Sequence, residues 1–400
     1  PDPTKQPTNL AAVVPAMKVD ALSPDLAQPS VWKANLAFEH ELPWMGLIVG
    51  AEYLRLQTKN SIYYEELNMG APTATGSDGR PLYYGPNAYK TSCWNATGGL
   101  IGGANCSALT KAGSNAAFGQ VLMAKNTDKG ESNVLTLSVR SPLREGLSWG
   151  SSYTYSDATE VSPLTSSTSS SNWGGRAVFN PNENVASNSN YMVKDRFTAN
   201  LNWQKRFFGE YKTTFGLFYE GRSGKPYSWT INNDLNGDGL AGNDLMYIPS
   251  APGSGEVVFS GATPAARAAN EAAFWKVVNA NGDLRKAKGG VIGRNESFAS
   301  WTNSFDVRLS QEVPGFFKGN KGIFTFDILN VGNMINRKWG RINEVAFQSA
   351  GGQVRSFVDY VGMENGKYVY NTRAVVEGLE TRQAKGESQW ALQATIKYEF

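Results

Sequence analysis

The chain lacks any long hydrophobic run. None of its 400 residues lies in an apolar stretch that approaches the roughly 18 to 20 residues of a membrane-spanning helix. A helical membrane protein is therefore excluded. The 38 basic and 35 acidic residues nearly balance, and no block of Lys or Arg could follow a phosphate backbone. We therefore expect no nucleic-acid partner.

Cysteine and histidine are scarce. Cys93 and Cys106 lie in a stretch rich in Gly, Ser and Asn. A disulfide between them would close a short exposed loop in an oxidising compartment, and two free thiols are the alternative.

The single histidine, His40, excludes a metal site with several His ligands. Its place at the end of a predicted strand favours an interfacial residue over a catalytic one. Phosphate loops, CxxC pairs and nucleophile elbows are also absent, so we expect no enzyme.

What the chain does have is strict alternation, most clearly in its last twelve residues. Polar side chains occupy one face of this segment, and the other face is apolar, formed by Trp390, Leu392, Ala394, Ile396, Tyr398 and Phe400. Successive side chains of a strand point to opposite sides, so the pattern predicts a strand with one face in lipid and one in water. A half-buried strand of a soluble sandwich can alternate in the same way. The pattern must therefore recur before it indicates a membrane barrel.

The alternation does recur, and we count about nine strands. Short turns with Pro or Gly join one end of each pair, and aromatic residues gather near these turns, as a membrane interface requires. The opposite ends open into long polar segments, about 57–131, 157–191, 223–297 and 333–386. Short turns at one end and long extracellular loops at the other are typical of outer-membrane barrels. We predict an all-β fold, an antiparallel transmembrane β-barrel that includes the whole chain, 1–400, in the bacterial outer membrane.

An odd strand count indicates an incomplete barrel. If the first and the last strand run in the same direction, they cannot close an antiparallel barrel by pairing with each other. The chain also begins at Pro1 without an initiator Met or an apolar leader, so we expect it to start after processing or inside a longer sequence. We predict that it forms the C-terminal part of a larger barrel.

Several segments, taken in order, resemble TonB-dependent outer-membrane receptors, and most closely their Oar-like subgroup. These are Asn126 to Gly130, Tyr219 to Tyr227, Asp234 to Asp244, Phe274 to Lys276, Gly289 to Asn295, Asn303 to Pro314, Phe324 to Asn333 and the terminal Phe400. The resemblance implies a barrel of twenty-two strands around an N-terminal plug, energised through the TonB complex. It also implies that Phe400 and its strand are the signal recognised by the barrel insertion machinery. Neither a plug nor a TonB-contacting segment is found in this sequence.

These features predict the barrel part of an active transporter whose long loops capture and gate a large or scarce substrate. Its expected partners are outer-membrane lipid, the missing plug and strands, the insertion machinery and, through the plug, the TonB complex. A passive pore or a surface adhesin that uses its loops for contact is the alternative. The substrate cannot be read from the sequence, because siderophore, sugar, peptide and protein cargoes would all suit polar and aromatic loops.

One loop has the spacing of a cation site. Asp234, Asn236, Asp238, Leu240 and Asp244 surround two glycines, and oxygen ligands on alternate residues with Gly at the sixth position resemble the first half of a calcium loop. The twelfth position is Leu245 in place of the closing Glu, so Asp244 would have to serve. The alternative is a loop held by its own Asx turns. Calcium is the one cofactor that the sequence suggests.

Three further features lie in the long loops. Thr263 and Pro264 begin an Ala-rich helix that runs to Ala280, with a structural role favoured over cargo contact. The run 162–172 is nearly all Ser and Thr, which predicts mobility. Loop aromatics could grip cargo or pack beneath the loops, and the sequence leaves both open for Tyr63, Tyr64, Tyr83, Tyr84, Trp94 and Trp173.

Overall fold

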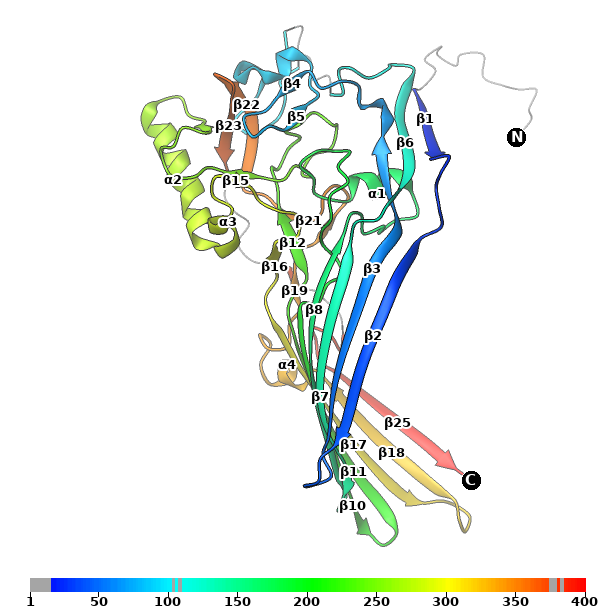
Figure 1. Cartoon of the computed structure of the whole chain (residues 1–400). Helices are drawn as coiled ribbons and strands as arrows, with labels where there is room; N and C mark the ends of the chain where they lie inside the picture. The colour runs from blue at the N-terminus through cyan, green and yellow to red at the C-terminus, as the bar shows by residue number, and fades with distance from the viewer. Residues whose placement is uncertain (1–15, 103–104, 107–109, 374–379, 382–384) are drawn as a thin grey trace, which may run out of the picture.

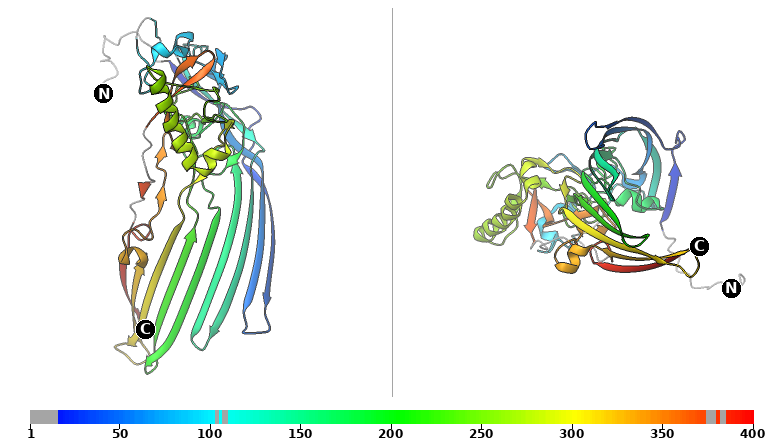
Figure 2. Two further views of the ribbon diagram at one scale, coloured as in Figure 1. Left: turned by 90° about the vertical axis from the view of Figure 1, so that its left-hand side faces the viewer. Right: turned by 90° about the horizontal axis from the view of Figure 1, so that it is seen from below.

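A computed structural model of the chain describes residues 16–102, 105–106, 110–373, 380–381 and 385–400. The predicted processing point falls in residues 1–15, which lie outside the described residues. Two predicted long loops are described only in part, because 57–131 lacks residues 103–104 and 107–109, and 333–386 lacks residues 374–379 and 382–384. The fold has two parts. A tall curved sheet forms one part, and the long connections gather above one end of this sheet (Figures 1 and 2).

The tall sheet, which we call the wall, is antiparallel throughout. Each strand pairs with the next along the chain. Its strands are β2 (Ser30–Glu41), β3 (Ile48–Glu66), β7 (Glu131–Arg144), β8 (Leu147–Glu160), β10 (Asp195–Phe208), β11 (Tyr211–Arg222), β17 (Thr302–Pro314), β18 (Lys321–Leu329) and β25 (Ala391–Glu399). Each stretch in which the sequence predicts alternation overlaps one of these strands, and the last one extends past both ends of β25 to Trp390 and Phe400. The mostly-β, antiparallel part of the prediction is confirmed.

Three more strands extend the same sheet beside β3 and β8. They are β1 (Met17–Leu22), which is parallel to β6, β6 (Phe118–Thr127), which pairs with the end of β3, and β9 (Ser187–Asn188). The pairing with β6 explains why β3 continues to Glu66, well past residue 57 where the first long loop was expected to begin. Strand β3 thus joins the wall to the folded connections above it.

The two faces of the wall differ as alternation requires. On one face, Leu309 lies between Phe215 and Phe326 on the neighbouring strands. On the other face, hydroxyl groups pair across strands, with 3.0 Å between Ser310 and Thr325. The same pairing recurs in Ser152 with Thr198 and in Thr136 with Thr154. The apolar face is open in this structure, and Leu36, Leu392 and Ile396 are 74%, 61% and 75% exposed.

A row of tyrosines marks the upper limit of the apolar face. The hydroxyl of each donates to an Asn or Asp oxygen on the next strand, namely Tyr53 to Asn133 at 2.7 Å, Tyr153 to Asp195 at 2.6 Å and Tyr219 to Asn303 at 2.7 Å. Exposed Phe207 and Phe316 lie at the other limit, near the short turns. From Phe197 to Phe207 a strand rises about 33 Å, or about 25 Å across a bilayer at a tilt of about 40°. This matches the apolar band of an outer-membrane barrel.

All short turns lie at one end of the wall, which we call the short-turn end. One of them joins β7 to β8 through Glu145 and Gly146, whose φ angles of 51° and 85° are both in the left-handed region that a two-residue hairpin turn needs. The other turns join β2 to β3, β10 to β11 and β17 to β18. The end of β25 also lies at the short-turn end, where Glu399 pairs with Lys321 beside the last of these turns.

The wall has two free edges in the described part of the chain. Strand β2 pairs only with β3, and β25 pairs only with β18. Both edge strands run toward the short-turn end, so they are parallel to each other (Figure 1). They therefore cannot close an all-antiparallel barrel by pairing with one another.

The long connections fold together into a body that we call the cap. Its elements are η1 (Leu67–Met69), β4 (Ala74–Thr75), β5 (Pro81–Leu82), η2 (Pro86–Tyr89), η3 (Thr91–Cys93), α1 (Ser169–Gly174), β12 (Pro226–Trp229), β13 (Tyr247–Ile248), β14 (Val258–Phe259), α2 (Pro264–Ala280), α3 (Gly282–Lys286), β15 (Gly290–Val291), β16 (Ser297–Phe298), β19 (Asn343–Glu344), β20 (Phe347–Gln348), β21 (Gly352–Arg355), β22 (Val358–Glu364), β23 (Lys367–Thr372) and β24 (Glu380–Thr381). The short helix α4 (Val331–Ile335) lies lower, against the wall strand β17 (Figure 1). The main hydrophobic core lies in the cap, where Tyr84, Trp229 and Phe357 are among its buried side chains.

Helix α2 begins and ends where the sequence predicts. The Thr263 side chain accepts a hydrogen bond from the Ala266 amide, and Pro264 is the first helical residue. Phe274 and Trp275 are buried, and the ring of Phe274 packs 5.4 Å from that of Phe357. This packing gives the helix a structural role in the cap core.

The Ser/Thr-rich run corrects a prediction. Residues 162–172 were expected to be mobile, yet the run leads into α1, and Asn172 is only 6% exposed. The reason is that the Asn172 side chain both accepts from the Ser166 amide and donates to the Ser166 carbonyl. The adjacent Trp173, at 4% exposed, then anchors α1 against Leu122 and Met69.

Candidate functional site

The acidic loop that resembled a calcium loop lies inside the cap, between β12 and β13. Asp234 accepts hydrogen bonds from the Gly237 amide at 2.6 Å and from the Gly239 amide at 2.9 Å. Both glycines have positive φ angles, 81° and 88°, which let their amides turn toward one carboxylate. Asp238 accepts from the Leu240 amide at 2.7 Å and from the Asn243 side chain at 2.8 Å.

The loop is fixed to the rest of the cap by Arg80. The Arg80 guanidinium lies 2.9 Å from Asp244 and 3.3 Å from Asp78, and it also donates to the Leu245 carbonyl. Arg80 and Asp244 are both fully buried. The other Asp244 oxygen accepts from the Leu235 amide at 2.8 Å. A buried carboxylate at the end of the loop is therefore paired with an arginine from a distant connection.

The cluster joins all four long connections. Arg80 and Asp78 belong to the first of them, and the Phe179 ring of the second lies 4.9 Å below the guanidinium. Asp244 belongs to the third, and Tyr368 of the fourth donates its hydroxyl to Asp78 at 2.7 Å. We call these residues the charge cluster. Their contacts tie segments far apart in the sequence into one folded unit.

The acidic loop brings three carboxylates close to the single arginine Arg80, and the pKa of each carboxyl is raised. Burial, together with repulsion from the nearby Asp244, raises the pKa of Asp238 to about 7. Burial also raises the pKa of Asp234, with added repulsion from Asp238 and Asp244. The pKa of Asp244 is raised by burial as well, although Arg80 opposes the shift. Ionisation of this loop is therefore costly in the folded state.

The geometry favours the Asx-turn alternative for this loop. The carboxylates of Asp234, Asp238 and Asp244 are occupied by amide donors and by Arg80, and Asn236 accepts from the Asp238 amide at 2.8 Å. Across the residues that the structure describes, no group of three or more His, Cys, Asp or Glu side chains is arranged to hold a metal ion. Two buried polar atoms of the loop are left without a hydrogen-bond partner, the Asn243 side-chain oxygen and the Asn236 side-chain nitrogen. Calcium at Asp234, Asn236, Asp238, Leu240 and Asp244 stays a prediction to be tested.

The cysteines are joined in the structure. Cys93 and Cys106 form a disulfide with their Cα atoms 5.1 Å apart, so the free-thiol alternative does not apply. The neighbouring Trp94 is buried, and its ring lies 5.0 Å from that of Tyr360 in β22. The disulfide thus closes a loop whose base is packed into the cap core.

The loop aromatics pack beneath the connections. Exposure is below 8% for Tyr63, Tyr83, Tyr84, Trp94 and Trp173, and Tyr64 packs partly buried beside Trp173. Of the two uses that the sequence left open, the structure shows packing. These rings are not available to grip cargo in this conformation.

A shallow hollow on the polar face of the wall is the better candidate for contact with cargo. It has a volume of about 260 Å³ and is lined by Asn200, Asn202, Phe218, Arg308 and Asp327, among others. The glycine at position 216 leaves space for the hollow. A Cβ atom at this position would lie 3.4 Å from side-chain atoms of both Arg308 and Asn202 and would partly fill the space. Arg308 and Asp327 form a two-bonded ion pair, at 2.6 and 3.3 Å. The hollow offers amides, a paired charge and one aromatic ring to a polar solute.

The last strand, β25, lies where the alternation predicts. Its apolar face carries the predicted insertion signal, Trp390, Leu392, Ile396, Tyr398 and Phe400, and Phe400 is fully exposed. The Tyr398 hydroxyl accepts from the Phe316 amide at 3.0 Å, which pins the β17 to β18 turn to this strand. His40 lies on the apolar face as its parity requires, with its ring stacked 6.2 Å from that of Phe38.

Arg80 could not be predicted from the sequence, because a lone arginine in a polar loop looks like an exposed charge. The hairpin of β22 and β23 could have been found. Asn365 and Gly366 form its turn with φ angles of 52° and 76°, and Asn-Gly between alternating residues is a strong hairpin signal.

Among the described residues, no helix has both the length and the apolar character needed to cross a membrane. A search of curated proteins found no match to the chain. A family model does match, over residues 1–358. Its description, outer membrane beta barrel domain, agrees with the antiparallel wall, the apolar band and the polar opposite face. The chain belongs to the family of outer membrane beta barrel domains.

Proposed function

We propose that the chain is the C-terminal barrel part of a TonB-dependent transporter of the Oar-like subgroup. The observation that carries this proposal is the pair of parallel free edges, β2 and β25. A barrel with these edges needs an odd number of further strands if all its strands are antiparallel. That requirement supports a wide barrel, such as one of twenty-two strands, because a wall of this size closed on itself would leave almost no lumen.

Each part of the molecule has a role in this proposal. The cap receives an extracellular substrate at the end of the wall with the long connections. The polar face of the wall, with the hollow around Phe218 and Arg308, lines the path toward the short-turn end. A plug and the segment that contacts the TonB complex would come from outside the present chain and supply gating and energy. The strand ending at Phe400 would guide insertion into the outer membrane.

A passive pore or an adhesin would use the same parts differently. The extensive hydrophobic core of the cap suits an adhesin, which needs a rigid contact surface. An adhesin has no need of a lumen, whereas a pore needs a lumen that is always open. The polar face of the wall, with its rows of hydroxyl pairs, favours a lumen.

Planar-bilayer conductance of the complete protein separates these functions. A plugged transporter should show little steady conductance until the plug is displaced, for example by a denaturant pulse. A steady open conductance from the outset would indicate a passive pore. If no conductance appears even after the plug is displaced or deleted, the protein has no through-lumen and the transport proposal fails.

A further inference from the structure

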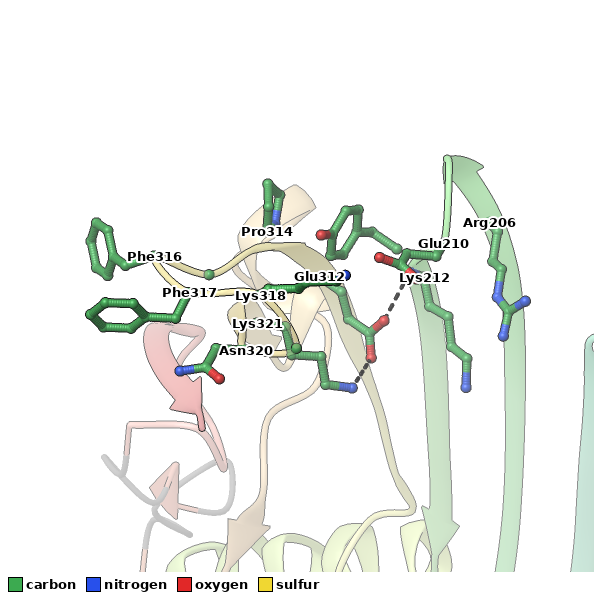
Figure 3. A pocket seen from close by; sticks show the side chains of 13 residues that line it. Arg206, Glu210, Lys212, Glu312, Pro314, Phe316, Phe317, Lys318, Asn320 and Lys321 are labelled. Atoms are coloured by element: carbon green, nitrogen blue, oxygen red, sulfur yellow. Dashed lines mark hydrogen bonds and ion pairs between the residues drawn. The ribbon is translucent and has the colours of Figure 1, made fainter.

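A second basin lies at the short-turn end, on the polar face of the wall. It has a volume of about 670 Å³ and is enclosed by the turn from β10 to β11 and the turn from β17 to β18 (Figure 3). Its lining includes four basic residues, Arg206, Lys212, Lys318 and Lys321, and two acidic residues, Glu210 and Glu312. We call it the basic basin. Neither the transport proposal nor the family assignment gives it a role.

The face of the wall decides what the basin can reach. Arg206 and Lys212 share the face of Asn202 and Gly216, because strand residues two apart point the same way. Phe207, which follows Arg206, and Phe215, which precedes Gly216, point to the apolar face instead. The basin therefore opens toward the lumen side of the wall and away from lipid.

Two cations in the basin lie directly opposite each other. Arg206 is the cross-strand partner of Lys212 in the register of β10 and β11. In Figure 3 the two side chains extend from adjacent strands toward the same side. Like charges directly opposite in a sheet destabilise it, so this pair needs a counter-charge to be favourable.

Among the described residues, the Glu312 carboxylate acts on the charge of Lys212 but forms no ion pair with it. Glu312 is already bound by the Lys321 ammonium at 2.7 Å and by the Lys212 backbone amide at 3.0 Å. Lys321 is further paired with Glu399 at 3.3 Å. Across the described chain, the side chains of Arg206 and Lys212 form no ion pair and no hydrogen bond, and Glu210 in the turn pairs with neither. The basin thus keeps a surplus of positive charge.

We propose that the basic basin binds an acidic polypeptide segment that enters the lumen from the short-turn end. Asp or Glu side chains two residues apart in an extended segment would present carboxylates to Arg206 and Lys212 together. Arginine offers two parallel donors to a carboxylate, and lysine adds a point charge beside it. The proposal does not depend on active transport, because a passive pore would present the same basin.

An anionic lipid headgroup carries similar chemistry but fits this place less well. Headgroups lie against the apolar face, next to Phe207. Phe316 and Phe317 of the turn also line the basin, but Arg206 and Lys212 point to the side opposite Phe207. A lipid phosphate would have to leave the bilayer to reach them. Lipid binding is therefore the competing outcome that a test must detect.

Photo-crosslinking in the complete protein, in its native membrane, tests the proposal. The photoreactive residue p-benzoylphenylalanine is placed at Gln204, which is two residues from Arg206 on the same face. We expect crosslinks to peptides that contain Asp or Glu close together, from the same protein or from a partner. The double variant Arg206→Gln with Lys212→Gln should lower the yield of these crosslinks about tenfold, because both cations that would bind the carboxylates are lost.

Two control variants make the result specific. Exchanging the two cations, Arg206→Lys with Lys212→Arg, keeps the charge and should keep the crosslink. Lys33→Gln removes an exposed cation from β2 on the same face of the wall and should leave the yield unchanged. The proposal is overturned by crosslinks mainly to lipid, by crosslinks to segments without carboxylates, by no crosslink, or by equal yield in the Gln double variant.

Discussion

The Arg80 guanidinium lies 2.9 Å from the carboxylate of Asp244, and neither side chain is exposed to solvent. The two residues are distant in sequence and belong to different connections between wall strands. Through Asp78, Tyr368 and Phe179, the same pair contacts the remaining connections. The cap is therefore built around a buried charge cluster as well as a hydrophobic core.

Replacing Arg80 with Met should destabilise the cap strongly. The substitution leaves Asp244 and Asp78 buried without their cation, and an unpaired buried charge costs about 3 to 5 kcal/mol. We expect rapid proteolysis in the long connections while the wall stays protected. The measurement is limited proteolysis with cleavage sites identified by mass spectrometry. The exposed pair Arg267 and Glu364 provides the control, since Arg267→Met should cost less than about 1 kcal/mol. Equal sensitivity of the two variants would contradict the role of Arg80.

Acidification should stabilise the cap, opposite to the usual behaviour of carboxylates. The pKa of Asp238 is about 7 in the fold, against 3.8 for an exposed aspartate. The folded state therefore binds protons more tightly between these values, and stability falls as the pH rises through that window. Above pH 7 the full penalty of the ionised carboxylate is present. Cleavage of the 234–244 loop by a protease active across this range should slow from pH 8 to pH 5.

The variant Asp238→Asn should flatten this pH dependence, because its side chain does not titrate. An unchanged profile in the variant would show that other groups cause the effect. The same cleavage assay tests the calcium prediction. Protection of the 234–244 loop at millimolar calcium would support a cation site, and no protection would remove it.

The tyrosine row should contribute modestly to stability. Tyr219→Phe keeps the ring, which lies 4.7 Å from Phe305, but removes the hydrogen bond to Asn303. We expect a loss of about 0.5 to 1.5 kcal/mol in the free energy of unfolding from lipid vesicles. Tyr219→Ala should cost more, since it also removes the ring. If the Phe variant were as unstable as the Ala variant, the ring would contribute nothing beyond the hydrogen bond, and this prediction would be refuted.

Arginine should be tolerated on one face of β25 and not on the other. Leu392 pairs with Ile328 on the apolar face, whereas Thr395 pairs with Thr325 on the polar face. Leu392→Arg near the middle of the bilayer should cost about 2 to 4 kcal/mol, and Thr395→Arg should have little effect. Denaturant unfolding in vesicles measures both, and equal costs would refute the assignment of faces.

The wall was predictable from sequence because each of its strands carries a local signal. Alternation marks residues such as Leu309 and Phe324, and the Pro and Gly turns fix where strands reverse. Helix α2 was equally clear, since Thr263 and Pro264 form a standard start. Strand β3 was underestimated because its last residues pair with β6, a contact that local patterning does not reveal.

The cap was not predictable in the same way. Its strands are short, and residues such as Phe357 and Tyr370 are buried by partners far away in the chain. Composition suggested a mobile Ser/Thr run, yet the Asn172 amide organises it through bonds to Ser166. The calcium-like spacing was visible, but the pairing of Asp244 with Arg80 depends on tertiary structure alone.

Depth-dependent quenching along β25 tests most directly the claim that this chain is a membrane-embedded barrel wall. Single cysteines at 392, 393, 394, 395, 396 and 397 are labelled with a fluorophore, after replacing Cys93 and Cys106 with Ser, in the complete protein in vesicles with nitroxide-labelled lipid. We predict strong quenching at Leu392, Ala394 and Ile396 and weak quenching at the three residues between and beyond them. Uniform quenching, or none at any position, would contradict the assignment of one face to lipid and the other to the lumen.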